Sequence, residues 1–148
     1  MYALFEHSFR MRDGDEARTY LSLPACIAPL KASVLPISNN PDFTPIVKLI
    51  SKSLTEAEVS HKIDDTSGSI GKRYARTDEV SIPYGICVDF DSLKEPHTAT
   101  LRERDSMLQV RMGIEEIPKV LKALANDKMT WAEVQAKYPK FEQQETTK

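Results

Sequence analysis

The stretch VSHKIDDTSGSIGKRYARTDEV, residues 59–80, places a short strand directly before a helix. Residues 59–64 are expected to form the strand, the glycine-bearing turn at residues 66–68 follows, and residues 69–80 are expected to form the helix. Ser69 can cap that helix, because a serine hydroxyl accepts from the free N–H groups of a first turn. A strand that leads through a turn into a helix is the building unit of an α/β fold.

The same unit is expected on the N-terminal side. Residues 31–37 (KASVLPI) predict the first core strand, which ends at its own proline and at the turn SNNP. Apolar residues then recur at helical spacing, with Asp42 as the expected N-cap and Pro45 in the first turn. They are Phe43, Ile46, Val47, Ile50, Leu54 and Ala57. The order up to residue 80 is therefore strand, helix, strand, helix.

On the C-terminal side, residues 82–90 predict a third strand and residues 98–103 a fourth, which can return antiparallel to the third. Residues 107–112 can pair as well. One apolar stripe over residues 114–124 predicts a third helix, and residues 130–133 (TWAE) form a capping box for a short fourth helix. The fold class is α/β, with one mixed sheet and helices packed on it.

Length and composition fit one ordinary domain. The chain has 148 residues, of which 41% are hydrophobic and 28% charged. Residues 31–142 are expected to form that domain. Residues 1–30, with a helical start, are interpreted as a remnant and linker from a preceding domain, and residues 143–148 as a disordered tail.

Cysteine use and hydropathy bear on the compartment. Cys26 and Cys87 both stand in apolar, strand-like surroundings, which predicts buried, reduced thiols and a reducing compartment. No apolar stretch approaches the length of a membrane span, and the acidic residues after Arg12 argue against a signal or transit peptide. The expected location is the cytoplasm, without contact to a membrane.

The net charge is -2, which excludes a global cationic field and with it nonspecific nucleic-acid binding driven by counterion release. RNA binding would need a local patch. Between residues 72 and 111 there are seven Lys or Arg and seven Asp or Glu, so this half is not broadly basic either.

The first candidate patch is the helix over residues 69–80. Lys72 and Arg76, four residues apart, share a helix face near the N-terminus, where backbone N–H groups also favour an anion; Arg73 adds a third positive charge. This pattern allows contact with an RNA backbone. It is not a nucleotide-hydrolysing loop, because only two residues separate Gly68 from Gly71. The alternative is a solvated basic face of an ordinary capped helix.

The second candidate is TATLRERDS, residues 98–106, where strand alternation puts Thr100, Arg102 and Arg104 on one face. Arginine donors suit phosphates and the acceptor edges of bases, and Asp105 can accept from a cytosine amino group. The alternative is a solvent-facing strand whose charges pair with each other across the hairpin.

Catalytic and metal sites are not indicated. His7, His61 and His97 are scattered and the two cysteines are far apart, so metal-ligand spacing is missing. The pairs Asp64-Asp65 and Asp89-Asp91 stand at strand ends, where they can equally terminate strands and cap helices. Trp131, inside the capping box, is expected to be a packing anchor.

Several motifs together resemble the eukaryotic and archaeal type of glycyl-tRNA synthetase, a class IIa aminoacyl-tRNA synthetase. They are SHKIDD (residues 60–65), SGSIGKRYARTDE (67–79), HTATLRERDSM (97–107), LFEH (4–7), PA (24–25), AP (28–29), VLP (34–36), Trp131 and YP (138–139). The resemblance covers nearly the whole chain. It implies the class IIa anticodon-binding fold, a mixed five-stranded sheet flanked by helices, and a catalytic domain that ends just before Met1.

The resemblance also implies a parent enzyme, a homodimeric glycine-tRNA ligase that uses ATP with magnesium in its catalytic domain. Its expected location is the cytoplasm, with mitochondria as an additional location of the parent. This portion would then need neither a cofactor nor a metal and would bind tRNA(Gly). Glycine anticodons carry cytosine at two positions. A carboxylate such as Asp105, with Arg102 and Arg104 beside it, can accept a hydrogen bond from the amino group of such a cytosine. A noncatalytic protein-interaction or polymerase-accessory module that reuses the same fold is the alternative.

Overall fold

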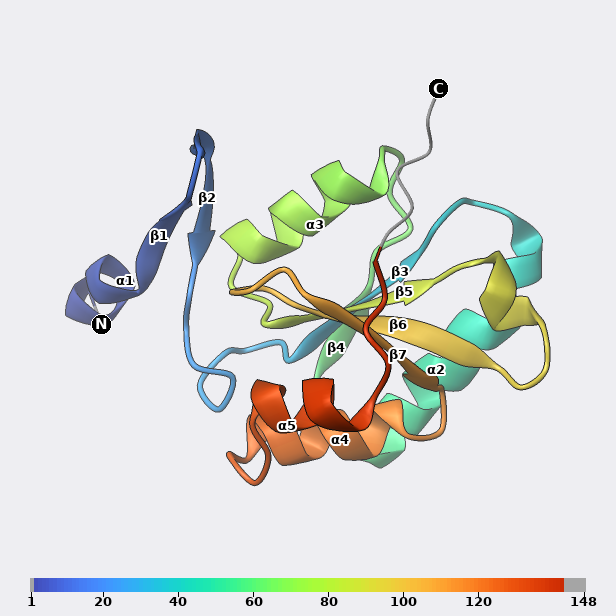
Figure 1. Ribbon diagram of the computed structural model, residues 1–148. Coiled ribbons are helices and arrows are strands. Elements are labelled where there is room, and N and C mark those ends of the chain that lie inside the picture. Colours follow the sequence, from blue (N-terminus) through green and yellow to red (C-terminus); the bar gives the residue numbers. More distant parts are fainter. Residues whose placement is uncertain (1, 143–148) are drawn as a thin grey trace.

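The structure, a computed structural model that describes residues 2–142, has a five-stranded sheet with helices on both faces and a two-stranded hairpin beside it (Figure 1). The sheet contains β3 (Ala32–Pro36), β4 (His61–Ile63), β5 (Tyr84–Val88), β6 (Thr98–Glu103) and β7 (Gln109–Gly113). The helices are α1 (Tyr2–Ser8), α2 (Thr44–Glu56), α3 (Ile70–Glu79), α4 (Ile117–Ala125) and α5 (Trp131–Lys137), and the hairpin pairs β1 (Phe9–Arg12) with β2 (Asp15–Leu21).

The sheet is mixed, as the sequence predicts. Its strand order is β4-β3-β5-β6-β7, in which β3 pairs in parallel with β4 and β5, whereas β5, β6 and β7 follow each other antiparallel. The helix α2 connects the parallel neighbours β3 and β4, the helix α3 connects β4 with β5 on the other side of β3, and the antiparallel pairs have short connections. The α/β fold class is confirmed.

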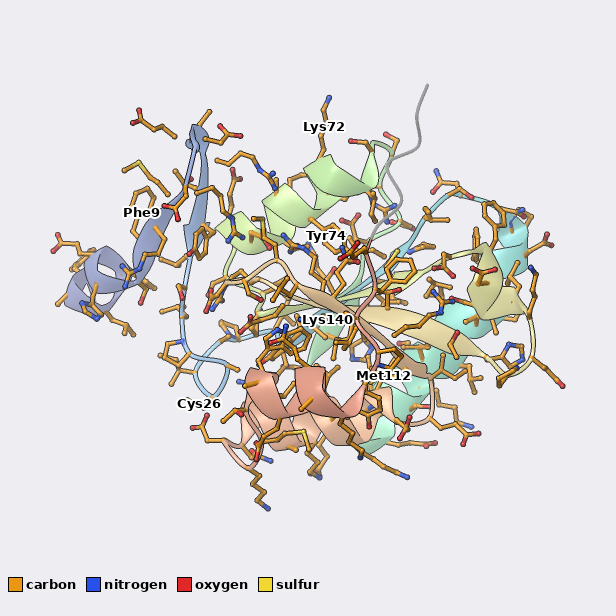
Figure 2. The ribbon with its side chains drawn as sticks, viewed as in Figure 1. Phe9, Cys26, Lys72, Tyr74, Met112 and Lys140 are labelled. Carbon is orange, nitrogen blue, oxygen red and sulfur yellow. The ribbon has the colours of Figure 1, made fainter. Side chains whose placement is uncertain are left out.

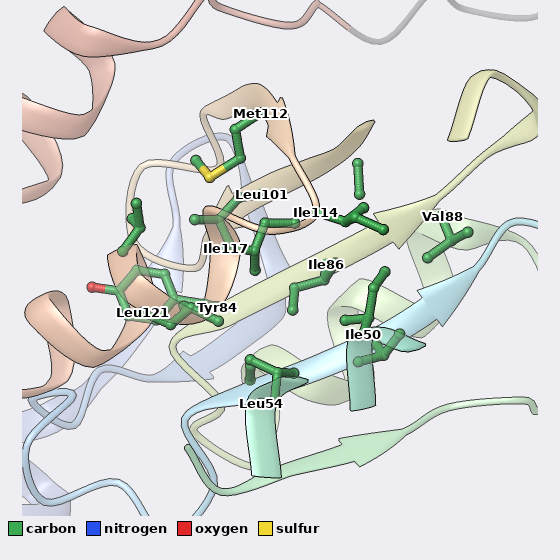
Figure 3. Packing of buried hydrophobic residues seen from close by; sticks show 14 of the residues in the cluster. Ile50, Leu54, Tyr84, Ile86, Val88, Leu101, Met112, Ile114, Ile117 and Leu121 are labelled. Atoms are coloured by element: carbon green, nitrogen blue, oxygen red, sulfur yellow. The ribbon is translucent and has the colours of Figure 1, made fainter. Parts of the chain in front are cut away.

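Strand alternation divides the sheet into two different faces. One face packs on α2, α4 and α5 and forms the main apolar core, which includes Ile86, Leu101 and Ile117 (Figure 3). The other face is covered by α3, and its apolar part is small, with Leu35, Tyr74 and Cys87. The rest of that second face is polar and charged, and it carries Thr100 and Arg102, both buried.

A 3-10 turn separates β3 from α2 and moves the start of the helix. The turn, Pro41–Phe43, is capped by the side chain of Asn40, which accepts from the backbone N–H of Asp42. The helix α2 then starts at Thr44 without a side-chain cap. The expectation that Asp42 caps this helix was wrong, because Asp42 already lies inside the preceding turn.

The two other predicted helix caps agree with the structure, whereas the helix expected over residues 114–124 begins only at Ile117. Ser69 accepts from the backbone N–H of Lys72 at the start of α3, and Thr130 with Glu133 forms the capping box of α5. The indole of Trp131 packs against the core, with its ring centroid 6.1 Å from that of Tyr84, which confirms its role as a packing anchor.

The N-terminal segment is only partly a helix. After α1 the chain forms the hairpin of β1 and β2, which turns at Gly14 with φ at 78° and stands next to the end of α3 (Figure 1). Phe9 is exposed on the hairpin, whereas Arg12 is buried. Cys26, in the loop that follows, is exposed, which corrects the expectation of two buried thiols; Cys87 is buried.

The segment after α5 returns to the edge of the sheet. Val110 of β7 forms an isolated bridge with Lys140, and the backbone N–H of Phe141 donates to the carbonyl of Gln109 at 2.9 Å. The predicted disordered tail, residues 143–148, lies outside the described residues. The predicted division between residues 1–30 and 31–142 stays a prediction.

Candidate nucleic-acid interface

The helix α3 separates its basic residues into exposed and buried ones. Lys72 and Arg76 are exposed, and Figure 2 shows Lys72 pointing away from the helix while Tyr74 points down to the sheet. The guanidinium of Arg76 reaches back to the carbonyl of Ser67 at 3.4 Å. These two cations therefore stand on the outer face of α3, as the sequence predicts, where they are free to meet an anion.

Arg73 lies on the inner face and is only 1% exposed. Its guanidinium donates to the carbonyl of Pro36 at 2.6 Å and to the carbonyl of Asp64, and its Nε lies 3.8 Å from the Asp64 carboxylate. These acceptors stand at the ends of β3 and β4. Arg73 therefore fixes α3 to the carboxyl edge of the parallel strands, and the expectation of a solvated Arg73 does not hold.

Arg102 points to the same face of the sheet as Thr100, which confirms the alternation, but that face is not open to solvent. Its guanidinium makes two hydrogen bonds to the carboxylate of Asp78 on α3, at 3.0 and 3.1 Å, and lies 4.4 Å from the ring centroid of Tyr74. The charge is paired, as the alternative interpretation expects. However, the partner comes from the covering helix and not from the hairpin of β6.

Arg104 follows directly after β6 and is 3% exposed. It donates from Nη2 to the carbonyl of Leu23 at 2.8 Å, from Nη1 to Ser81 at 3.3 Å, and from Nε to Asp105 Oδ1 at 2.9 Å. Its guanidinium is thus enclosed by three different segments. Arg104 and Arg102 do not project together into solvent, because α3 and the segment after β2 cover them.

Asp105 is the exposed member of the predicted group, with 44% of its side chain accessible. Its Oδ1 accepts from Arg104 and from the hydroxyl of Ser22 at 3.0 Å. Among residues 2–142, no donor is bonded to Oδ2, which leaves this oxygen able to accept from a ligand.

A small cavity of about 210 Å³ opens beside Asp105. Its walls are formed by the segment after β2 and by the facing ends of β5 and β6, and they include Leu23, Pro83 and Tyr84, with Glu103 and Asp105 as the two carboxylates. The cavity therefore combines apolar surfaces with acceptors, a combination that suits an unstacked nucleobase with an amino group.

The remaining strand-end carboxylates have structural partners. Burial alone would raise the pKa of Asp89, but hydrogen bonds from Arg111 and Ser92 outweigh it and hold the pKa below its usual 3.8. Burial likewise opposes the lowering at Asp64, where hydrogen bonds from Thr66 and the charge of Arg73 bring the pKa down. Within the described part of the chain, no cluster of His, Cys, Asp or Glu could hold a metal ion.

Two residues of this region were missed by sequence reasoning. Arg12 donates to Asp78 Oδ2 at 2.9 Å and to the carbonyl of Arg104 at 2.6 Å, so the N-terminal hairpin belongs to the same buried network. The Asp13-Gly14 pair, a typical hairpin signal, could have revealed that hairpin. Asp78 gave no signal, because a charged residue on a helix is usually exposed.

Among the helices in residues 2–142, none has both the length and the apolar character that crossing a bilayer requires.

The chain is similar over its full length to glycine–tRNA ligases from insects. It is 61% identical to that of Drosophila melanogaster and 59% identical to that of Bombyx mori, over all 148 residues in each case. It spans only about a fifth of the length of these relatives, 19% and 20% respectively. A yeast relative, the mitochondrial glycine–tRNA ligase 1 of Saccharomyces cerevisiae, is 44% identical over 90% of this chain and 19% of its own.

Solved structures support the same fold. Prolyl-tRNA synthetase from Cryptosporidium parvum, complexed with L-proline and AMP, superposes on 72% of this chain and 24% of its own with a TM-score of 0.64 at 25% identity. The anticodon binding domain family matches residues 31–124, which include the whole sheet, α2, α3 and nearly all of α4. This match covers well over half of the chain, and the chain therefore belongs to the family of anticodon binding domains.

Proposed function

We propose that this chain binds the anticodon stem-loop of tRNA(Gly), with the cavity beside Asp105 as the place where a cytosine of the anticodon is read. One observation carries the proposal: Asp105 lines the cavity with a side chain that is 44% exposed, and Arg104 and Ser22 hold it through Oδ1, so that within residues 2–142 no donor is bonded to Oδ2. A carboxylate held in this way is a rigid acceptor for the cytosine amino group.

Each residue predicted from the sequence has a different part in this proposal. Asp105 makes the contact to the base, and Arg104 orients Asp105 from behind. Arg102, bonded to Asp78, holds β6 under α3. Lys72 and Arg76 on the outer face of α3 are the groups for the RNA backbone, and Arg73 supports their helix from its inner face.

We further propose that the chain is the anticodon-binding part of a glycine–tRNA ligase. That enzyme would attach glycine to tRNA with ATP and magnesium, bound by another domain, and would act as a homodimer in the cytoplasm and in mitochondria. The similarity over the full chain to glycine–tRNA ligases supports this assignment. It does not favour a protein-interaction or polymerase-accessory module.

The test compares two labelled anticodon stem-loops, one with both cytosines and one in which uracil replaces them, by fluorescence anisotropy over a salt series. We expect tighter binding of the cytosine loop by roughly 5- to 150-fold, the factor that corresponds to a discrimination of about 1 to 3 kcal/mol at one base. Equal binding of the two loops would contradict the proposal.

Variants locate the site. Asp105→Ala removes an exposed side chain and should abolish the preference for cytosine without unfolding the protein. Asp91→Ala is the matched control, because it removes an equally negative and largely exposed carboxylate from the turn after β5. Retention of the preference in the Asp105 variant would move the recognition site elsewhere.

A further inference from the structure

The side chain of Arg12 connects the N-terminal hairpin with the turn after β6. Arg12 is the last residue of β1, and its side chain is 7% exposed. Its guanidinium donates from Nη1 to the carbonyl of Asp105 at 3.0 Å, and from Nη2 to the carbonyl of Arg104 at 2.6 Å and to Asp78 at 2.9 Å. Three acceptors from two distant segments thus meet on one cation.

The guanidinium is also held in place from the hairpin side. It lies over the ring of Tyr20 on β2, 3.8 Å from the ring centroid, a distance typical of a cation–π contact. Because stacking fixes the plane of the guanidinium, its two terminal nitrogens have fixed directions toward their acceptors. The hairpin therefore supplies a rigid donor to the turn.

Apart from the bond between Arg12 and Asp78, the side-chain hydrogen bonds from this side converge on residues 104 and 105. Besides Arg12, the hydroxyl of Ser22 donates to the Asp105 carboxylate, and the carbonyl of Leu23 accepts from Arg104. The turn follows a strand end, where chain position is least constrained by the sheet. Without these contacts, both carbonyls and the orientation of Asp105 would lose their support from the N-terminal segment.

We propose that Arg12 is a positioning residue for base recognition: by clamping the two carbonyls of residues 104 and 105 against Asp78, it sets the direction in which the Asp105 carboxylate faces the RNA. This inference rests on the function proposed above. It makes the N-terminal hairpin part of the RNA-reading apparatus, although the hairpin precedes the matched region, residues 31–124. A structural change in the hairpin would be transmitted to the anticodon-reading turn.

The choice of arginine fits this role. A lysine ammonium is a single point of charge and can replace only part of the contacts that the planar guanidinium makes with three acceptors. A methionine keeps an unbranched stem but lacks the guanidinium, and it donates no hydrogen bond. The variants Arg12→Lys and Arg12→Met therefore separate the effect of the hydrogen bonds to the three acceptors from the effect of the space that the side chain fills.

The test measures the affinity ratio of the 148-residue chain for the cytosine and uracil stem-loops. Arg12→Met should bring the ratio from its wild-type value close to one, with binding of the uracil loop nearly unchanged, and Arg12→Lys should give an intermediate ratio. Arg10→Met is the matched control: it removes the same charge from the same strand, but within residues 2–142 Arg10 bonds only to the carbonyls of His7 and Phe9 in its own segment. Its ratio should stay that of the wild type.

Each outcome is decisive. If the wild type discriminates and folded Arg12→Met does so equally, Arg12 has no positioning role. If the wild type itself does not discriminate, the proposed function fails and this inference fails with it, a result that is distinguishable from the first. Should Arg12→Met not fold, amide hydrogen exchange in Arg12→Lys decides: faster exchange of the Asp105 and Ser106 amides with α2 unchanged supports the clamp, and wild-type exchange overturns it.

Discussion

The ring of Tyr74 lies so close to the backbone of Gly85 that a Cβ atom on residue 85 would come within 2.7 Å of Tyr74 Cε1. Tyr74 belongs to α3 and Gly85 to β5, so the missing side chain is what lets the helix approach the sheet. Gly85→Ala should therefore destabilise the protein by about 1 to 3 kcal/mol, the usual cost of overpacking.

Urea unfolding measures this cost. Gly71→Ala is the control, since a Cβ at that position in the first turn of α3 meets nothing within 4 Å. Replacing a helical glycine by alanine there should stabilise the protein slightly, by roughly 0.4 to 1 kcal/mol. An equal effect of the two substitutions would show that Tyr74 can move aside.

The carboxylate of Asp78 is shared by Arg12 and Arg102, and all three side chains are less than a tenth exposed. Asp78→Asn would leave two buried guanidiniums facing a neutral amide, so we expect a loss of about 3 to 5 kcal/mol of unfolding free energy. Thermal and urea unfolding check it, with Asp91→Asn, at an exposed ion pair, as the control. A loss as small as that of the control would mean that water reaches the network.

Asp89 predicts a change of stability with pH. Its carboxylate accepts two hydrogen bonds from Arg111, at 2.7 and 3.0 Å, and its pKa is lowered in the folded protein in spite of burial. A lowered pKa adds stability above the unfolded value of 3.8, and this stability is lost as the pH falls through the lower folded pKa.

The variant Asp89→Asn should therefore be less stable than the wild type by about 1 to 3 kcal/mol at pH 7, and the difference should shrink as the pH falls below about 3.8. Chemical unfolding at pH 7, 5 and 3 measures the difference. A gap that stays constant over this range would show that the ion pair does not contribute to the acid sensitivity.

Lys72 on the outer face of α3 predicts a change in salt dependence. If it contacts one phosphate, Lys72→Ala should reduce the slope of log affinity against log salt by roughly 0.7 to 0.9, with the preference for cytosine unchanged. Anisotropy titrations at several salt concentrations test this, and Lys52→Ala on α2 is the control at a similarly exposed lysine. An unchanged slope would exclude the contact.

The order of strands and helices was predictable because it depends on local periodicity. The alternation in residues 98–106 also showed that Thr100 and Arg102 share a face. What the sequence did not show is the cover over that face: α3 brings Asp78 to Arg102, and the hairpin brings Arg12. Such pairs join residues far apart in the chain, and one sequence carries no periodic signal for them.

The start of the chain was predicted only in part. Leu4 and Phe5 lie in the helix α1, which confirms the expected helical start, but the helix ends at Ser8 and Phe9 already belongs to β1. Three of the six residues predicted to contact tRNA are buried, namely Arg73, Arg102 and Arg104. The residue types correctly indicated that the region is charged. Whether each of these side chains is exposed depends on how distant segments pack over it.

The bridge between Val110 and Lys140 has a consequence for association between molecules. An open strand edge can pair with a strand of another chain and start aggregation. At β7 the carbonyl of Gln109 and the N–H of Arg111, on either side of Val110, are already bonded to the segment after α5. At the opposite border, β4 is only three residues long. The sheet is therefore poorly suited to adding strands from neighbours, and removal of residues 138–142 should make the protein prone to aggregate.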